Sequence, residues 1–288
     1  MSQHKHVLIT GTSSGFGFEG AKALAARGHK VSATMRGVNG KNENAAAALR
    51  AFAEKGGYDL KVIELDVTDQ ASVDQAVKEA SAAAPIDVLI NNAGVGVWGI
   101  DEGYSVDQAK QIFEVNLFGP MRVTRAVLPA MRQAKQGLLM YVSSGLGRFV
   151  LPFMAIYNSS KYALEGYVET CNVELAPEGV KSLIIEPGAF GTDIAGKNPE
   201  PARDLTSEYG PTAAVFQAFS NAFEENRSAG NLGDPQMVVD AFVEEVERPN
   251  GPVSLRRPVG HDVFAPVSAL NAASEQCQKD IFATFGLA

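Results

Sequence analysis

The feature that most constrains the fold is a regular alternation of short apolar runs and helical patterns along the first two thirds of the chain. The apolar runs predict strands at 7–10, 31–35, 60–65, 88–90, 138–142 and 180–185. Between them, apolar periodicity and helix-ending residues predict helices at 16–27, 42–55, 69–83, about 105–133, and 157–175. Short connections between such elements require a parallel sheet with helices on both faces.

The last third of the chain continues this pattern less regularly. It loosens between Ala189 and Asp234, after which Asp234-Pro235 resembles the start of a helix that runs to about Glu247. Residues 253–259 are the candidate for a last strand. The sequence therefore predicts an α/β protein with a Rossmann-type, doubly wound parallel sheet of about seven strands. Without a repeat or a linker, residues 1–288 are expected to form a single domain.

Charge and cysteine content exclude several classes of function. The net charge of -8 disfavours nucleic acid and anionic membranes as partners. Cys171 and Cys277 lie far apart, and no Cys/His cluster suggests a metal site; His4 and His6 are assigned to a loose terminus. With neither a signal segment nor a long apolar run, the chain is expected to be cytoplasmic and free of the membrane.

A glycine-rich turn, Thr10-Gly11-Thr12-Ser13-Ser14-Gly15-Phe16-Gly17, joins the first expected strand to the first expected helix. Glycines let backbone N–H groups approach a phosphate, which also gains from the positive end of the helix dipole. A purely structural tight turn is the alternative. The position of the turn in the first strand–helix unit favours a dinucleotide site, with these candidate residues: Gly11, Ser13, Ser14, Gly15, Phe16 and Gly17.

The end of the second strand indicates which dinucleotide is bound. An acidic residue there takes the ribose 2′-hydroxyl of NAD, whereas an arginine accommodates the 2′-phosphate of NADP. This strand ends in Arg36, with no acid nearby, and Ser13 could add a hydroxyl donor. A solvated surface charge is the other interpretation of Arg36. The sequence favours NADP(H) over NAD(H).

Four polar residues are candidates for the chemistry. Tyr157 and Lys161 lie four apart on one helix face, Ser144 precedes Tyr157 by 13 residues at the end of the fifth strand, and Asn116 lies in the long helix. Each alone has an ordinary structural explanation: a half-buried tyrosine, a solvated lysine, a turn serine and a helix-face amide. Because the four residues occur together and in this order, a catalytic group is the better interpretation.

These residues together give the chain a resemblance to the short-chain dehydrogenase/reductase family. The matching motifs are TGxxxGxG at 10–17, Asp66-Val67, NNAG at 91–94, Asn116, Ser144, YxxxK at 157–161 and PGxxxT at 187–192. They occur in order over about two thirds of the chain. Beyond residue 192 the resemblance extends to the fold but not to substrate contacts.

The resemblance implies an NADP(H)-dependent oxidoreductase that interconverts a secondary alcohol and a ketone or aldehyde. Tyr157 is then the general acid or base, with a pKa lowered by Lys161 and the oxidised nicotinamide. Ser144 binds the substrate oxygen, Lys161 the nicotinamide ribose, and Asn116 a water of the proton relay. Further cofactor contacts are implied for Asp66, Val67, Asn92, Ala93, Gly94, Pro187, Gly188 and Thr192.

The resemblance leaves the substrate and the assembly less defined. Residues 189–234 are expected to form a variable substrate loop, and its phenylalanines suggest an apolar alcohol or ketone. Core packing is an equal alternative for the candidate pocket residues Trp98, Leu146, Phe149, Phe153 and Phe190. A homodimer or homotetramer is expected through the helices at about 105–133 and 157–175, with 268–288 as a C-terminal extension that contacts a partner or covers the pocket.

Three other functions compete with this interpretation. A sugar-nucleotide epimerase usually has TGxxGxxG and a longer C-terminal part, unlike this chain. A non-catalytic NADP-binding sensor is expected to lose the tyrosine or the lysine, and both are present. An NAD-preferring dehydrogenase is the third alternative, and Arg36 at the end of the second strand argues against it.

Overall fold

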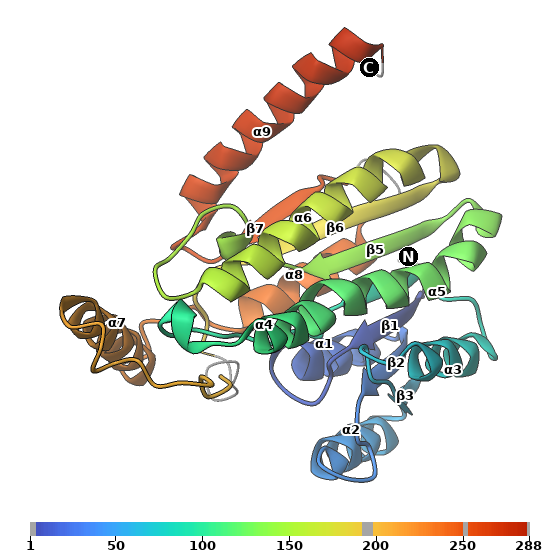
Figure 1. Cartoon of the computed structure of the whole chain (residues 1–288). Helices are drawn as coiled ribbons and strands as arrows, with labels where there is room; N and C mark the ends of the chain where they lie inside the picture. The colour runs from blue at the N-terminus through green and yellow to red at the C-terminus, as the bar shows by residue number, and fades with distance from the viewer. Residues whose placement is uncertain (1–3, 192–197, 250–252, 287–288) are drawn as a thin grey trace.

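A sheet of seven parallel strands forms the centre of the computed structural model, which describes residues 4–191, 198–249 and 253–286 (Figure 1). The strand order is β3-β2-β1-β4-β5-β6-β7, and every neighbouring pair is parallel. The strands are β1 (His6–Thr10), β2 (Lys30–Met35), β3 (Leu60–Glu64), β4 (Val88–Asn91), β5 (Gly137–Val142), β6 (Val180–Pro187) and β7 (Arg256–Val259). The predicted Rossmann-type sheet is confirmed.

Successive residues of each strand face opposite sides of the sheet, and each side has its own helices. On one side, Val7 and Ile9 of β1 pack in a core with α1 (Gly15–Ala26), α2 (Glu43–Gly56) and α8 (Gln236–Glu247). On the other side, Leu8 packs in a second core with α3 (Gln70–Ser81), α5 (Gly119–Ala134) and α6 (Ala155–Leu175). Burial on both faces explains why the strands read as continuous apolar runs rather than alternating ones.

The strand order fixes where a ligand can bind. The chain leaves β1 toward β2 on one side and later returns to add β4 on the other, so the direction of winding reverses between β1 and β4. In such sheets the connections at the carboxyl ends diverge at this point and leave a crevice. The glycine-rich turn after β1 and the NNAG segment after β4 both lie there.

The structure differs from the sequence prediction in several elements. The helix predicted at about 105–133 consists of α4 (Val106–Phe113), a π-helical turn (Glu114–Phe118) and α5. In the π-helical turn the backbone hydrogen bonds span five residues instead of the four of an α-helix. The loosened segment at 189–234 contains a long helix, α7 (Pro211–Ser228). The assignment of His6 to a loose terminus is wrong: it is buried in β1, and its Nε2 lies 2.9 Å from Ser32 Oγ.

The C-terminal segment forms a helix, α9 (Phe264–Phe285), that extends away from the sheet (Figure 1). Val267 and Asn271 in its first turns are buried, Gln278 further along donates to Glu169 of α6 at 3.0 Å, and Ile281 and Phe285 near its end are exposed. In the described part of the chain, none of the helices combines the length and the apolarity needed to cross a bilayer.

Candidate active site

A cavity of about 880 Å³ lies between the turn after β1 and the start of α6. This volume lies in the range of small-molecule and cofactor sites, about 300–1,000 Å³. It is lined by most of the predicted site residues: Gly11, Ser13, Ser14, Gly15, Phe16, Arg36, Asp66, Val67, Asn92, Ala93, Gly94, Ser144, Tyr157, Lys161, Pro187 and Gly188. Gly17 and Asn116 are not part of the lining, and Thr192 lies outside the described residues.

The glycine-rich turn forms one end of this cavity. Gly11 and Gly15 have φ angles of 72° and 58°, in the left-handed region that favours glycine. Asn92, at the end of β4, donates from Nδ2 to the carbonyl oxygens of Thr10 at 2.9 Å and Gly11 at 3.1 Å. A Cβ on Gly17 would lie 2.4 Å from that nitrogen, so Gly17 serves the packing of α1 against Asn92. The turn thus presents the amino end of α1 to the cavity, as phosphate binding requires.

Two cations lie beyond this turn, beside the second strand. Arg36 Nη1 is 3.8 Å from Asp66 Oδ2, and the Arg36 side chain is half exposed. Lys41, in the loop that follows β2, also lines the cavity. Burial raises the pKa of Asp66, but hydrogen bonds from Thr68 and the charge of Arg36 outweigh it, so the net pKa is lowered. Asp66 therefore stays ionised, and it faces the arginine that sequence analysis assigned to a phosphate.

Tyr157 lies at the other end of the cavity and is almost fully buried. Burial raises the pKa of its phenol to about 12, and a hydrogen bond with Ser144 acts in the opposite direction. The lowering expected from Lys161 is therefore not found in the protein alone. The cause is geometric: Lys161 Nζ lies 5.7 Å from the centre of the Tyr157 ring and donates to the Val142 carbonyl at 2.9 Å.

Lys161 itself is buried, with 4% of its surface exposed. Burial lowers the pKa of the amine to about 8, and the nearby Glu165 carboxylate limits the fall. The Nζ atom lies close to the place where a Cβ on Gly94 would stand, at 3.7 Å. A Cβ at position 94 would make ordinary van der Waals contact with the amine, so Gly94 and Lys161 lie side by side in the wall of the cavity.

Asn116 does not line the cavity, but it hydrogen-bonds residues next to it. Its Oδ1 accepts from the Val95 N–H at 2.9 Å, and its Nδ2 donates to the Val95 carbonyl at 2.9 Å and to Ser160 Oγ at 3.0 Å. The π-helical turn that contains Asn116 has the kind of irregularity often found at functional sites. The amide thus ties the segment after β4 to the helix that carries Lys161.

The two neighbouring serines have different surroundings. The Ser144 hydroxyl lowers the pKa of the Tyr157 phenol. Its Oγ accepts from the Leu146 N–H at 3.1 Å and donates to the Pro187 carbonyl at 3.5 Å. Ser143 also reaches the cavity, but its Oγ lies beside Gly147, 2.9 Å from where a Cβ would stand. Of the two hydroxyls, that of Ser144 lies with the phenol.

Aromatic side chains surround the end of the cavity near Tyr157. Of the proposed pocket residues, Trp98, Leu146, Phe149 and Phe190 line it. Phe153 does not: its ring packs on α7, at 5.1 Å from Phe216 and 6.0 Å from Phe219 between ring centres. It also has a φ of 64°, a costly conformation for a bulky residue, so this contact fixes a strained backbone.

Lys41 and Asp262 also line the cavity and were not among the candidates from the sequence, whereas Phe219 and Phe223 belong to the phenylalanine-rich segment proposed for the substrate. The spacing of Phe216, Phe219 and Phe223 by three and four residues was the available signal for α7. Asp262 follows β7 at the carboxyl edge of the sheet, and its Oδ2 accepts from the Ala189 N–H at 3.0 Å. The sequence pattern predicts the last strand but gives no signal for the carboxylate that follows it.

The donor groups along this cavity fit a nicotinamide dinucleotide. The amino end of α1 and two cations offer positive potential for phosphates at one end, and Val67 and Leu65 offer apolar surface beside Asp66. At the other end, the phenol of Tyr157 and the amine of Lys161 face the same space. One continuous cavity therefore joins a phosphate-binding turn to a potential proton donor.

Comparisons with known proteins agree with this geometry. The family model for short chain dehydrogenases matches residues 5–203. Retinol dehydrogenase 8 of Bos taurus is 39% identical over 273 residues, covering 92% of this chain and 84% of that protein. The 3-ketodihydrosphingosine reductase of Bacteroides thetaiotaomicron is 36% identical and covers 87% and 86%. A short-chain dehydrogenase structure from Streptomyces avermitilis has a TM-score of 0.74 and 30% identity, covering 99% and 98%.

The pKa of Lys161 leads to a prediction about stability. The unfolded lysine keeps its proton up to about pH 10.5, whereas the folded one releases it near pH 8. Between these values the unfolded state binds more protons, so the free energy of unfolding rises with pH. Below pH 8 the buried charge costs on the order of 3 kcal/mol. We expect Lys161→Met to raise the free energy of unfolding at pH 7, because methionine removes this cost. The lost hydrogen bond to the Val142 carbonyl reduces that gain by about 1 kcal/mol.

Urea unfolding at pH 7 and at several values up to pH 10.5 measures this effect. The difference between variant and wild type should shrink as pH rises. Lys110→Met is the control, because the Lys110 side chain is 71% exposed. A Lys161→Met protein that is less stable at pH 7, with an unchanged pH dependence, would contradict the prediction.

Proposed function

The chain belongs to the short chain dehydrogenase family of oxidoreductases, whose members bind a nicotinamide cofactor, and we propose that it interconverts an alcohol and its ketone or aldehyde with NADP(H). The observation that carries the proposal is the grouping of Tyr157, Ser144 and Lys161 at one end of a cavity whose other end is the glycine-rich turn. This places a proton donor within the space of a dinucleotide site.

The proposed roles follow from the chemistry of each side chain. A bound nicotinamide supplies or accepts the hydride. Tyr157 exchanges the proton with the substrate oxygen, and the Ser144 hydroxyl donates a hydrogen bond to that oxygen, where charge develops. Lys161 provides positive charge near the phenol and binds cofactor hydroxyls. Asn116 holds the Lys161 segment in place and contributes to the proton relay.

The pKa of Tyr157 favours one direction in the protein alone. A phenol with a pKa of about 12 is protonated at neutral pH, which is the form that reduction of a carbonyl requires. Oxidation requires the phenolate, and that form needs more positive charge than Lys161 supplies here. We therefore expect carbonyl reduction to be the faster direction near neutral pH.

The wall of the cavity supports an apolar substrate. Phe219 and Phe223 of α7 face the cavity, and the Phe223 ring lies 6.2 Å from that of Trp98. Helix α7, which lies within the predicted substrate segment 189–234, is thus proposed as part of the substrate wall. Relatives named for retinol, estradiol and 3-ketodihydrosphingosine support the same class, because all three compounds are largely hydrocarbon.

NADP(H) is proposed as the cofactor because positive charge gathers at the phosphate end. Arg36, Lys41 and Ser13 line the cavity there, and the sole carboxylate of its lining at that end, within the described residues, is Asp66. A guanidinium binds phosphate oxygens through two parallel hydrogen bonds, whereas a ribose hydroxyl offers it little.

A homo-oligomer is part of the proposal. Tyr162 and Val173 on α6 and Phe118 at the start of α5 are apolar and exposed by 42%, 41% and 39%. They lie on the two helices through which the family commonly pairs, and their burial against a second copy would remove apolar surface from water.

Replacing Tyr157 tests the proposed function. Tyr157→Phe removes the hydroxyl alone, so turnover should fall by about 10²–10⁴-fold while folding and cofactor binding remain. The assay follows cofactor absorbance with retinaldehyde, estrone and other apolar carbonyl compounds. Tyr162→Phe on the same helix is the control and should keep full activity. Wild type inactive on the whole panel, or a Tyr157→Phe variant as active as wild type, would refute the proposal.

The serine pair provides a second test. Ser144→Ala should lower turnover by about 10-fold or more, because a hydrogen bond to developing charge is lost. Ser143→Ala should have a much smaller effect, since its hydroxyl lies beside Gly147 rather than with the phenol. Equal losses, or a larger loss in Ser143→Ala, would show that the assignment of Ser144 is wrong.

The cofactor assignment is tested by titrating NADPH and NADH. Arg36→Ala should weaken NADPH binding by about tenfold or more, since hydrogen bonds to charged groups contribute about 1.5–3 kcal/mol each. NADH affinity should barely change. Arg50→Ala, an exposed arginine on α2, is the control and should change neither. Equal wild-type affinity for both cofactors would overturn the assignment, as would a variant that keeps the full preference.

A further inference from the structure

A buried carboxylate lies one helical turn beyond the active-site lysine. Glu165 follows Lys161 by four residues on α6, so the two side chains share a face. Only 2% of Glu165 is exposed, and it does not line the cavity. It therefore touches neither substrate nor cofactor, and any role in the chemistry must pass through Lys161.

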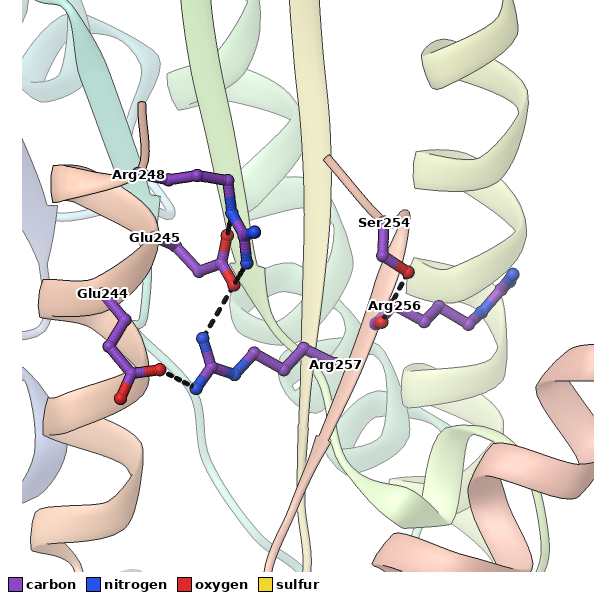
Figure 2. Close-up of polar contacts among 6 residues, drawn as sticks. All are labelled: Glu244, Glu245, Arg248, Ser254, Arg256 and Arg257. Atoms are coloured by element: carbon purple, nitrogen blue, oxygen red, sulfur yellow. Dashed lines mark hydrogen bonds and ion pairs between the residues drawn. The ribbon is translucent and has the colours of Figure 1, made fainter. Parts of the chain in front are cut away.

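Glu165 is held by an arginine from the last strand of the sheet. Arg256 Nε donates to Glu165 Oε2 at 3.0 Å, and Arg256 Nη2 donates to Glu169 Oε2 at 2.9 Å. Figure 2 shows that Arg256 and Arg257, adjacent on β7, point in opposite directions, as strand residues do. Arg257 bonds Glu244 and Glu245 on α8, whereas Arg256 crosses to α6.

A third carboxyl group completes this cluster. Glu186, at the end of β6, is fully buried, and its Oε1 lies 3.7 Å from Arg256 Nε. Asn271 of α9 donates to its Oε2 at 2.7 Å. Two fully buried carboxyls thus share one arginine, with Glu169 at the edge.

This cluster is costly for stability. Among the described residues, Glu165 Oε1, Glu186 Oε1 and Arg256 Nη1 are buried without a hydrogen-bond partner. A buried polar atom left unpaired costs about 1–3 kcal/mol, and apolar residues can often replace buried ion pairs without loss. Local features that oppose stability are expected at functional sites. Packing therefore does not explain the cluster.

We propose that Glu165, held in place by Arg256, is a positioning residue that keeps the buried Lys161 amine charged. The inference rests on the proposed function, in which Lys161 supplies positive charge beside Tyr157. A buried amine alone tends to lose its proton, and a carboxylate one turn away favours the charged form. Burial raises the pKa of Glu165 overall, and Arg256, 3.0 Å away, opposes that rise and so favours the carboxylate.

The charged groups around Glu165 come from every element packed against it. Arg256 comes from β7, Glu186 from β6, Arg148 from the loop before α6, and Lys161 and Glu169 from its own helix. Helix α9 contributes the uncharged Asn271 and Gln278. Burial and the nearby Glu165 raise the pKa of Glu186 to about 8, and burial also raises the pKa of Glu165, so the two carboxyls compete for the charge of Arg256.

The test is the titration of Lys161 in Glu165→Gln. Carbon-13 NMR of ε-labelled lysine follows the amine directly, with Lys161→Met identifying its signal. Wild type should titrate near pH 8. The variant should titrate about 1 pH unit lower, so the charged fraction at pH 8 falls from about half to about a tenth. The basic limb of the pH profile of turnover should move by the same amount.

Glu169→Gln is the matched control. It also removes a carboxylate bonded to Arg256, but it lies two helical turns from Lys161 and should leave the Lys161 titration unchanged. Glu165→Asp keeps the charge and should restore most of the wild-type value. An unchanged Lys161 titration in Glu165→Gln, or an equal shift in Glu169→Gln, would overturn the proposal.

If Glu165→Gln does not fold, Glu186→Gln provides a second test of the proposal. It removes the carboxylate that competes for Arg256 and retains an oxygen for Asn271, so Glu165 becomes more fully ionised. The Lys161 titration should then stay or rise, and a fall would contradict the proposal. If the proposed function is wrong, the Tyr157→Phe variant will instead keep its turnover. The titration of Lys161 does not depend on that result.

Discussion

All seven strands run in the same direction, so all their carboxyl ends lie along one edge of the sheet. Everything at the site depends on this constraint. The glycine-rich turn follows β1, Arg36 follows β2, Asn92 follows β4, Ser144 follows β5 and Gly188 follows β6. Residues separated by more than 170 positions are thereby brought to one cavity. The layers of helices on both faces bury most of the inner strands.

Within this frame, burial and charge act against each other. The interior that excludes water from Tyr157 and Lys161 also makes the phenolate and the ammonium unfavourable. The protein counters this with fixed groups rather than with solvent: Ser144 at the phenol, the Val142 carbonyl at the amine, and Glu165 one turn away. The site is therefore a set of partly compensated charges, and each pKa depends on neighbours from several elements.

Much of the fold and of the candidate site could be predicted, since both follow from local patterns. Apolar runs and glycine spacing located six strands, and the motifs located the cavity residues from Gly11 to Gly188. What could not be predicted depends on contacts between distant segments. The π-helical turn at Asn116 arises where its amide bonds the Val95 backbone. The elevated pKa of Tyr157 comes from burial by several elements. The role proposed for Glu165 cannot be predicted from the sequence, because it depends on β7 bringing Arg256 beside it.

The contribution of β7 also has a consequence for the timing of synthesis. Helix α6, with Tyr157, Lys161 and Glu165, is made well before Arg256, which follows Glu165 about 90 residues later. At about 5–20 residues per second, that interval is roughly 5–20 s on the ribosome. During it Glu165 has no arginine partner, so the strands from β1 to β6 can assemble before the charge on α6 is paired. The last strand to emerge thus supplies the partner of a residue made about 90 positions earlier.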